Sequence, residues 1–193
     1  MNKILFLLSI VLMASCIHKP EVKKQVDVNI DNEELFSIFF NDQEDRQVNE
    51  IDWGYVNKRD SIRRSRVQEL LDSNKVITSR DFKNAAMVFQ HGKDSIAYRK
   101  AVNLMKKSIE LDSTMNKWLF AAATDRYLLS IGEPQIYGTQ YKRNWDEPWR
   151  LGKIDSTKIS DAERIKFGVE TLAEQKEKVK KLNRELNQKI DKK

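Results

Sequence analysis

The sequence predicts a mainly α-helical protein built from repeat-like helix pairs, with one small β-hairpin and a C-terminal helix. Three observations lead to this fold class. Apolar residues recur at helical spacing through most of residues 32–132. A short stretch with the Ile, Tyr and Thr content of a strand follows Pro134. A Lys- and Glu-rich segment with one apolar stripe, typical of a helix, closes the chain.

The beginning of the chain has the residue order of a secretory signal peptide, which we predict over residues 1–15. Lys3 gives a positive start, Ile4–Met13 is apolar except for Ser9, and small residues follow. The apolar run is shorter than the ~20 residues that span a bilayer. The Met-Ala-Ser-Cys ending at Cys16 resembles a bacterial lipobox, in which the cysteine thiol receives lipid and the chain is cut before it.

Cys16 is the only cysteine of the chain, so no second thiol is present to form an internal disulfide. We therefore expect lipidation of Cys16, a lipidated tether over residues 16–31, and attachment to the cell membrane or the outer membrane, outside the cytoplasm. A secreted protein with a chance cysteine is the alternative. The expected partners are the membrane and a protein of the cell envelope. Nucleic acid is not an expected partner of an exported protein, despite the formal net charge of +6.

Capping residues mark the starts of the helices in the predicted domain, residues 32–172. Each cap is a Ser, Asn or Asp before an apolar stripe, because these side chains accept hydrogen bonds from the free amides of a first helical turn. The predicted caps are Asn32 before Leu35–Phe40, Asp60 before 61–72, Ser79 before Phe82–Phe89, and Asp94 or Ser95 before Ala97–Ile109. A further helix carries Met115–Leu129. Gly92 and Gly132 are the predicted helix ends.

Residues 97–112 resemble the second helix of a tetratricopeptide repeat, and Ala121–Ala123 continue the small-residue pattern in the next helix. No clean 34-residue repeat accompanies them. We therefore expect a tetratricopeptide-like character of the helix pairs rather than a repeat array.

The chain after Pro134 predicts a β-hairpin near residues 135–155. Its strands would be Gln135–Lys142 and Trp149–Ile154, joined by a polar turn that contains Asn144 and Asp146. Trp145 and Trp149 either pack under this hairpin or face a partner.

Two helices are predicted after the hairpin. Ser160–Glu163 matches a capping box that opens a short helix ended by Gly168. A last helix begins at about Thr171, and residues 173–193 form its charged C-terminal part. Its apolar stripe suits a solvated helix that packs one side on the domain, or a helix that binds a partner or forms a coiled coil.

Asp125 stands out because its position conflicts with its charge. It lies on or beside the apolar stripe that runs from Trp118 to Leu129 in the predicted helix. A carboxylate there is costly to bury unless it is paired and hydrogen-bonded. Arg126 points about 100° away around the helix, so we expect another partner for Asp125, either the Gln135–Gln140 stretch or Arg46.

Further polar residues join Asp125 in one candidate network or ligand site. The set is Gln90, His91, Asp125, Arg126, Gln135, Tyr137, Thr139 and Gln140. His91 either caps its helix and joins a hydrogen-bond network or forms an acid–base pair with Asp125. Gly138 indicates a bulge or a close backbone approach. The arginines nearby are expected in ion pairs, with an anion site as the alternative: Arg46, Arg63 and Arg64.

The same motifs, in this order, resemble a bacterial family catalogued as domain of unknown function 6624. They are Asp42-Gln43-x-Asp45-Arg46, Asp60-x-x-Arg63-Arg64, Gln90-His91, Asp125-Arg126 and the signature Gln135-x-Tyr137-Gly138-Thr139-Gln140. The resemblance covers roughly residues 35–180. The sequence of Ala85–Gly92 and the lipoprotein-like start are similar to versions from the Bacteroidetes. The resemblance implies a shared fold and polar centre, and it implies no reaction.

These observations favour a lipid-anchored interaction or scaffold protein of the cell envelope. No metal or cofactor is expected, because His18 lies in the tether and the chain has no glycine-rich phosphate loop and no nucleophile elbow. An enzymatic role is therefore not favoured. The alternative is small-ligand binding, or acid–base or hydrolytic chemistry that uses His91 and Asp125. For the polar set itself we expect a buried network that fixes the hairpin on the helices.

Overall fold

The computed structural model describes residues 30–145 and 147–190. The predicted signal peptide, Cys16 and most of the predicted tether lie outside the described residues, as does Asp146 of the predicted turn. The described chain contains seven α-helices and one two-stranded antiparallel sheet, so the mainly helical fold class with a hairpin and a C-terminal helix is confirmed. Within these residues no helix is long and apolar enough to cross a membrane.

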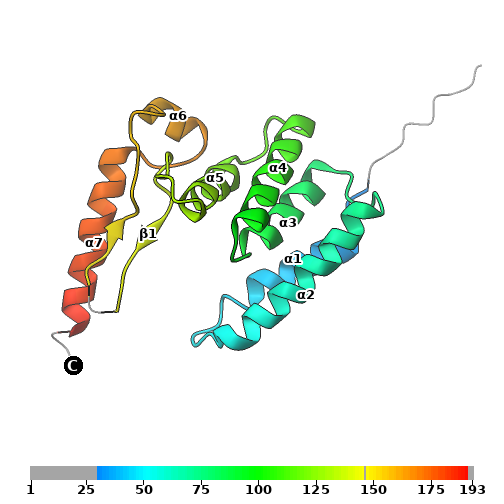
Figure 1. Ribbon diagram of the computed structural model, residues 1–193, viewed down its shortest axis with the longest axis horizontal. Helices are drawn as coiled ribbons and strands as arrows, with labels where there is room; N and C mark the ends of the chain where they lie inside the picture. Colours follow the sequence, from blue (N-terminus) through cyan, green and yellow to red (C-terminus); the bar gives the residue numbers. More distant parts are fainter. Residues whose placement is uncertain (1–29, 146, 191–193) are drawn as a thin grey trace, which may run out of the picture.

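The elements follow one another in space largely in chain order, with α1 and α2 at one end and α7 at the other (Figure 1). They are α1 (Glu33–Glu44), α2 (Trp53–Asp72), α3 (Ser79–Gln90), α4 (Ser95–Leu111), α5 (Trp118–Ser130), β1 (Tyr141–Lys142), β2 (Arg150–Leu151), α6 (Asp161–Lys166) and α7 (Leu172–Ile190). Helix α3 contacts α1, α2, α4 and α5 and is therefore the centre of the helical part.

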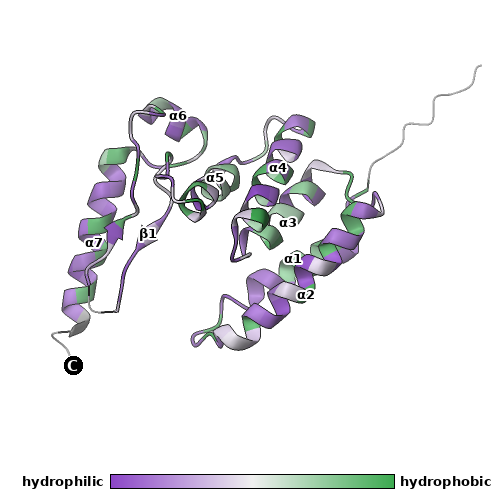
Figure 2. Ribbon diagram, viewed as in Figure 1, coloured by the Kyte–Doolittle hydropathy of each residue, from purple (hydrophilic) through white to green (hydrophobic). Residues whose placement is uncertain are grey.

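Two apolar clusters hold these elements together. The larger one joins α1 to α5 and includes the fully buried Leu35, Val67 and Met105. The smaller one, around Tyr137 and Val169, joins α5 to the C-terminal third of the chain. Figure 2 shows α2 and α7 as mostly hydrophilic ribbons, so each contributes only a narrow apolar stripe to the protein interior.

Most of the predicted helix starts are confirmed. Asn32 and Asp94 accept hydrogen bonds from first-turn amides of α1 and α4, and Ser160–Glu163 forms a complete capping box at α6. The cap of α3 is Thr78 and not Ser79, so that prediction was wrong by one residue. The hydroxyl of Ser79 donates instead to a backbone carbonyl of α4.

Helix α2 begins at Trp53, so the predicted cap at Asp60 was wrong. Its N-cap is Asp52, whose carboxylate accepts hydrogen bonds from two amides of the first turn. Asp60 lies in the middle of the helix and is buried together with Arg63. Because charged residues occupy positions of the buried stripe, the apolar pattern of the first two turns was hidden. Ile62, an apolar residue of the same helix, is exposed.

The hairpin is present but shorter than predicted. Tyr141 pairs with Leu151 and Lys142 with Arg150, and these pairs make up the antiparallel ladder. Gln135 forms an isolated parallel bridge with Ile154 outside that ladder. Residues 135–140, called the 135–140 segment below, therefore do not extend β1.

The two tryptophans of the hairpin have different surroundings. Trp145 is almost completely exposed, whereas Trp149 is partly buried. The backbone amide of Trp149 donates to Asn183 of α7, and Arg143 lies over its ring. The C-terminal helix therefore packs against the hairpin.

Candidate functional site

The carboxylate of Asp125 is the centre of the candidate site. It is fully buried in α5. It accepts four hydrogen bonds of 2.8–2.9 Å, from the amides of Ile136, Tyr137 and Thr139 and from the Thr139 hydroxyl. The expected partner stretch, Gln135–Gln140, is thereby found. Four donors around one carboxylate leave it little capacity to meet a substrate, so its role here is to fix the 135–140 segment against α5.

The carbonyls of the same segment are bound from the opposite side. Arg164 donates to the carbonyls of Ile136 and Tyr137 at 3.0 and 3.2 Å. Gln175 of α7 donates to the Tyr137 carbonyl at 2.8 Å. Both side chains are fully buried. The segment's backbone groups are thus divided between α5, α6 and α7, and the segment joins these three helices.

Sequence reasoning missed the roles of Arg164 and Gln175. No sequence pattern assigned Arg164 to the candidate site. Gln175 lies in a Lys- and Glu-rich helix whose polar residues were assigned to solvent. Their helical spacing places both residues on the buried sides of α6 and α7. This spacing is a weak signal, because polar side chains are normally assigned to solvent.

The side chain of Gln135 closes the 135–140 segment on itself. Its amide nitrogen donates to the carbonyls of Gln140 and Gly152 at 3.0 Å, and its oxygen accepts from the Gln140 amide at 2.9 Å. The side chain is completely buried. Because it makes these three bonds, Gln135 fixes the distance between the two ends of the segment.

Gly138 is required by both backbone and space. Its φ is +88°, and a Cβ built on it would lie 1.9 Å from Oε1 of Gln175. We expect Gly138→Ala to lower the free energy of unfolding by about 2–4 kcal/mol, from backbone strain and displacement of Gln175. Urea denaturation followed by circular dichroism would measure it.

Gly132→Ala is the matched control for that variant. Gly132 has a φ of +85°, but a Cβ there would meet nothing within 4 Å. It should therefore lose only the backbone term, about 1–2 kcal/mol. Equal losses in the two variants would show that the close approach to Gln175 does not matter.

A separate group of charges lies between α1 and α2, and we call Asp42, Asp45, Arg46, Asp60 and Arg63 the α1–α2 ion-pair cluster. Arg46 bonds to Asp42 at 3.1 Å and to Asp60 at 2.5 Å. Arg63 bonds to Asp60 at 3.1 Å and to Asp45 at 2.5 Å. The expectation of ion pairs for Arg46 and Arg63 agrees with this geometry, and Arg46 does not bond to Asp125.

His91 belongs to that cluster and not to Asp125. Its Nδ1 lies 2.8 Å from Oδ2 of Asp42, across 49 residues of sequence. The alternative considered for His91, an acid–base pair with Asp125, is not formed in the described chain, because Asp125 is enclosed by the 135–140 segment. The backbone carbonyl of His91 accepts from Arg64 at 3.3 Å. The residue therefore ties the end of α3 to both α1 and α2.

Arg126 connects the remaining candidate residues. Its Nε donates to Oε1 of Gln140 at 3.1 Å, and its Nη1 donates to the carbonyl of Gln90 at 3.0 Å. Gln140 in turn donates to the hydroxyl of Thr139. A chain of hydrogen bonds thus runs from Asp125 to the end of α3. The side-chain oxygen of Gln90 is buried and finds no partner in the described residues.

Burial raises the pKa of Tyr137 to about 12, and Asp125 nearby adds to the shift. An unfolded tyrosine ionises near pH ~10. The folded state therefore favours the neutral phenol, and this stability is fully present below pH ~10 and is lost as the pH rises to about 12. We expect Tyr137→Phe to flatten the fall of the unfolding free energy in that window, measured as urea midpoints against pH. Identical slopes for the two proteins would contradict it.

The fold and the site define the class of protein. It is a mainly helical protein whose buried polar centre fixes a hairpin and a C-terminal helix on a helical core. The family model described as "Family of unknown function (DUF6624)" matches residues 46–187. The match covers most of the chain, so the chain belongs to this family. No curated protein and no solved structure matches it. Among the described residues, no three His, Cys, Asp or Glu side chains are placed to hold a metal ion.

Proposed function

We propose that this protein is a lipid-anchored interaction module of the cell envelope. The lipid anchor is supported by the position of Cys16. It is the only cysteine of the sequence and directly follows the apolar run Ile4–Met13 and two small residues. A lipid on Cys16 would hold the folded domain near a membrane, because the 14 residues from there to Ile30 span at most about 50 Å. The membrane is then the first partner of the chain.

Cys16→Ser tests the anchor. Cells that express the native protein should incorporate a labelled fatty acid into it and retain it in the membrane fraction after a high-salt wash. The variant should lose the label and leave that fraction. A labelled Cys16→Ser protein, or one that still resists the wash, would contradict the proposal.

Two observations support the interaction role: the buried polar residues of the candidate site have structural tasks, and α1 presents an exposed aromatic face. Asp125 and Gln135 are buried and hold the 135–140 segment, which is a structural task. On α1, Phe36 and Phe40 are each about half exposed, at 50% and 51%, and their rings lie 6.3 Å apart. Phe39 is the third ring of this group. Contiguous exposed apolar groups are typical of protein-binding surfaces.

We propose that the α1 aromatic face, Phe36, Phe39 and Phe40, binds an apolar surface of an envelope protein at the same membrane. Cross-linking and affinity purification from membranes should recover a stable partner with the native chain and not with Phe36→Ser/Phe40→Ser. Ile165→Ser is the control, since Ile165 is 62% exposed on α6, far from α1 (Figure 1). Recovery of no partner by the native chain, or equal recovery by the aromatic variant, would overturn this role.

A further inference from the structure

Arg126 is partly buried and has no carboxylate partner in the described residues, in contrast to the ion-paired arginines of the protein interior. Arg46, Arg63 and Arg164 each form an ion pair with an aspartate. Arg126 donates only to neutral oxygens, those of Gln140 and the Gln90 carbonyl. A partly buried charge is normally compensated by an opposite charge, so this guanidinium lacks the partner that its burial calls for.

The surroundings of Arg126 are positive. Burial lowers its pKa, and Arg46 nearby lowers it further, whereas the hydroxyl of Tyr98 acts in the opposite direction. An anion next to the guanidinium would offset both the cost of burial and the repulsion from Arg46.

Arg126 lines an open pocket of about 360 Å³ between α4, α5 and the start of the hairpin. Two more cations line it, Lys93 and Lys142, and none of the lining residues is acidic. The neutral lining groups include the hydroxyl of Tyr98 and the side-chain amide of Gln140, while the hydroxyl of Ser130 already donates to the Tyr127 carbonyl. Cations and hydroxyl or amide donors around one small cavity are the groups that bind phosphate or carboxylate oxygens.

The site is also held in place before any ligand arrives. Gln140, which fixes Nε of Arg126, is itself bound through Gln135 and Thr139 to the Asp125 centre. Tyr141, which also lines the pocket, is neutral at ordinary pH because burial raises its pKa to about 12. A fixed guanidinium loses less freedom on binding, so it favours affinity.

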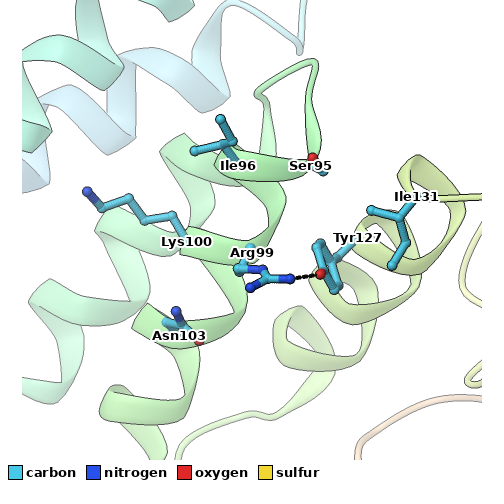
Figure 3. Close-up of a pocket in the computed structure, with 7 residues that line it drawn as sticks. All are labelled: Ser95, Ile96, Arg99, Lys100, Asn103, Tyr127 and Ile131. Atoms are coloured by element: carbon cyan, nitrogen blue, oxygen red, sulfur yellow. Dashed lines mark hydrogen bonds between the residues drawn. The ribbon is translucent and has the colours of Figure 1, made fainter.

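A second cavity, of about 450 Å³, also contains an arginine and can be compared with the pocket at Arg126 (Figure 3). It lies between α4 and α5 and contains Arg99, Lys100 and Tyr127. There Arg99 donates to the Tyr127 hydroxyl and lies over its ring, and Lys100 bonds to Gln68. Arg99 is exposed, so water solvates its charge, whereas the charge of Arg126 is partly buried.

We propose that the pocket at Arg126 binds the oxyanion group of a small molecule, a phosphate or a carboxylate, with Arg126 as the fixed cation and Lys93 and Lys142 as flanking cations. No residue of α1 lines this pocket, and the proposal does not depend on the interaction role.

Titration of the purified chain with inorganic phosphate and with succinate, at constant ionic strength, tests the proposal. Calorimetry should show saturable binding of at least one probe at one site, and the tighter probe identifies phosphate or carboxylate as the preferred group. Lys93→Gln and Lys142→Gln remove exposed lysines of the pocket and should each weaken binding about three- to fivefold. The double variant should weaken it about tenfold.

Arg99→Gln is the matched control, because it removes one positive charge from the other cavity and should leave the affinity unchanged. Three results would overturn the proposal. Neither probe binds saturably, the double lysine variant binds like the native chain, or Arg99→Gln weakens binding as much as the pocket variants do. Circular dichroism of each variant confirms that the fold is kept.

Discussion

Asp125→Ala is expected to lower the free energy of unfolding by about 4 kcal/mol and the melting temperature by about 10 °C. The carboxylate accepts three backbone amides and one hydroxyl of the 135–140 segment, and it is fully buried. Without it these four donors have no acceptor in a site closed to water. Hydrogen bonds to charged groups contribute ~1.5–3 kcal/mol each, so partial relaxation still leaves a large loss. Thermal melting followed by circular dichroism measures it.

Asp112→Ala is the control, because it also removes a carboxylate that accepts hydrogen bonds from an amide and a hydroxyl. Asp112 accepts hydrogen bonds from the amide and hydroxyl of Thr114 but is only partly buried. Water can replace it there, so its removal should change the melting temperature little. Hydrogen exchange gives a second readout, because the amides of Ile136, Tyr137 and Thr139 should lose protection in Asp125→Ala. A variant that melts within about 2 °C of the native protein would show that the segment is held by other contacts.

Asp60→Ala is expected to lower the free energy of unfolding by about 3–5 kcal/mol. Asp60 is buried between Arg46 and Arg63 and accepts a hydrogen bond from each. Its removal leaves two guanidinium groups close together with one aspartate less to balance them. Urea denaturation should show a lower midpoint with an unchanged slope.

Two further variants define the origin of that loss. Glu34→Ala removes an exposed ion pair with Arg66 between the same two helices and should change stability little. Asp60→Leu/Arg63→Met removes one acid and one base together, leaving Arg46 paired with Asp42. It should therefore be more stable than Asp60→Ala. A double variant less stable than the single one would indicate that the charges themselves, and not their balance, are required.

The helices with plain apolar stripes were predicted well from the sequence, and α2 shows why one was not. Helices α3 to α5 also bury polar residues, such as Asp81, Asn84 and Asp125, but most of their buried residues are small or apolar, and α4 also carries a standard cap. The buried face of α2 contains Asp60 and Arg63 among Val56, Val67 and Leu70. Periodicity within α2 predicts that such a face is solvent-exposed, because burial of those charges depends on packing against α1, which the spacing inside one helix does not describe.

The polar centre was predicted in part. Asp125 was found from its conflict with the apolar stripe, and its partner stretch followed from the candidate residues nearby. The strand predicted at Gln135–Lys142 failed for a physical reason. The amides of Ile136, Tyr137 and Thr139 donate to Asp125 and are not available to a partner strand. The pairing of His91 with Asp42 joins residues 49 positions apart, and local patterns carry no information on such a contact.

The arrangement of the elements in chain order determines which part of the molecule can unfold separately. The main contacts join helices that are neighbours, or next neighbours, along the chain, and α7 meets the rest mainly through the hairpin and the 135–140 segment. In such linear assemblies stability is close to a sum of local terms, and one end can unfold while the other remains intact. The C-terminal third is therefore the natural unit of partial unfolding. Its release would uncover Asp125 and disturb the pocket at Arg126 while α1 to α4 keep their structure.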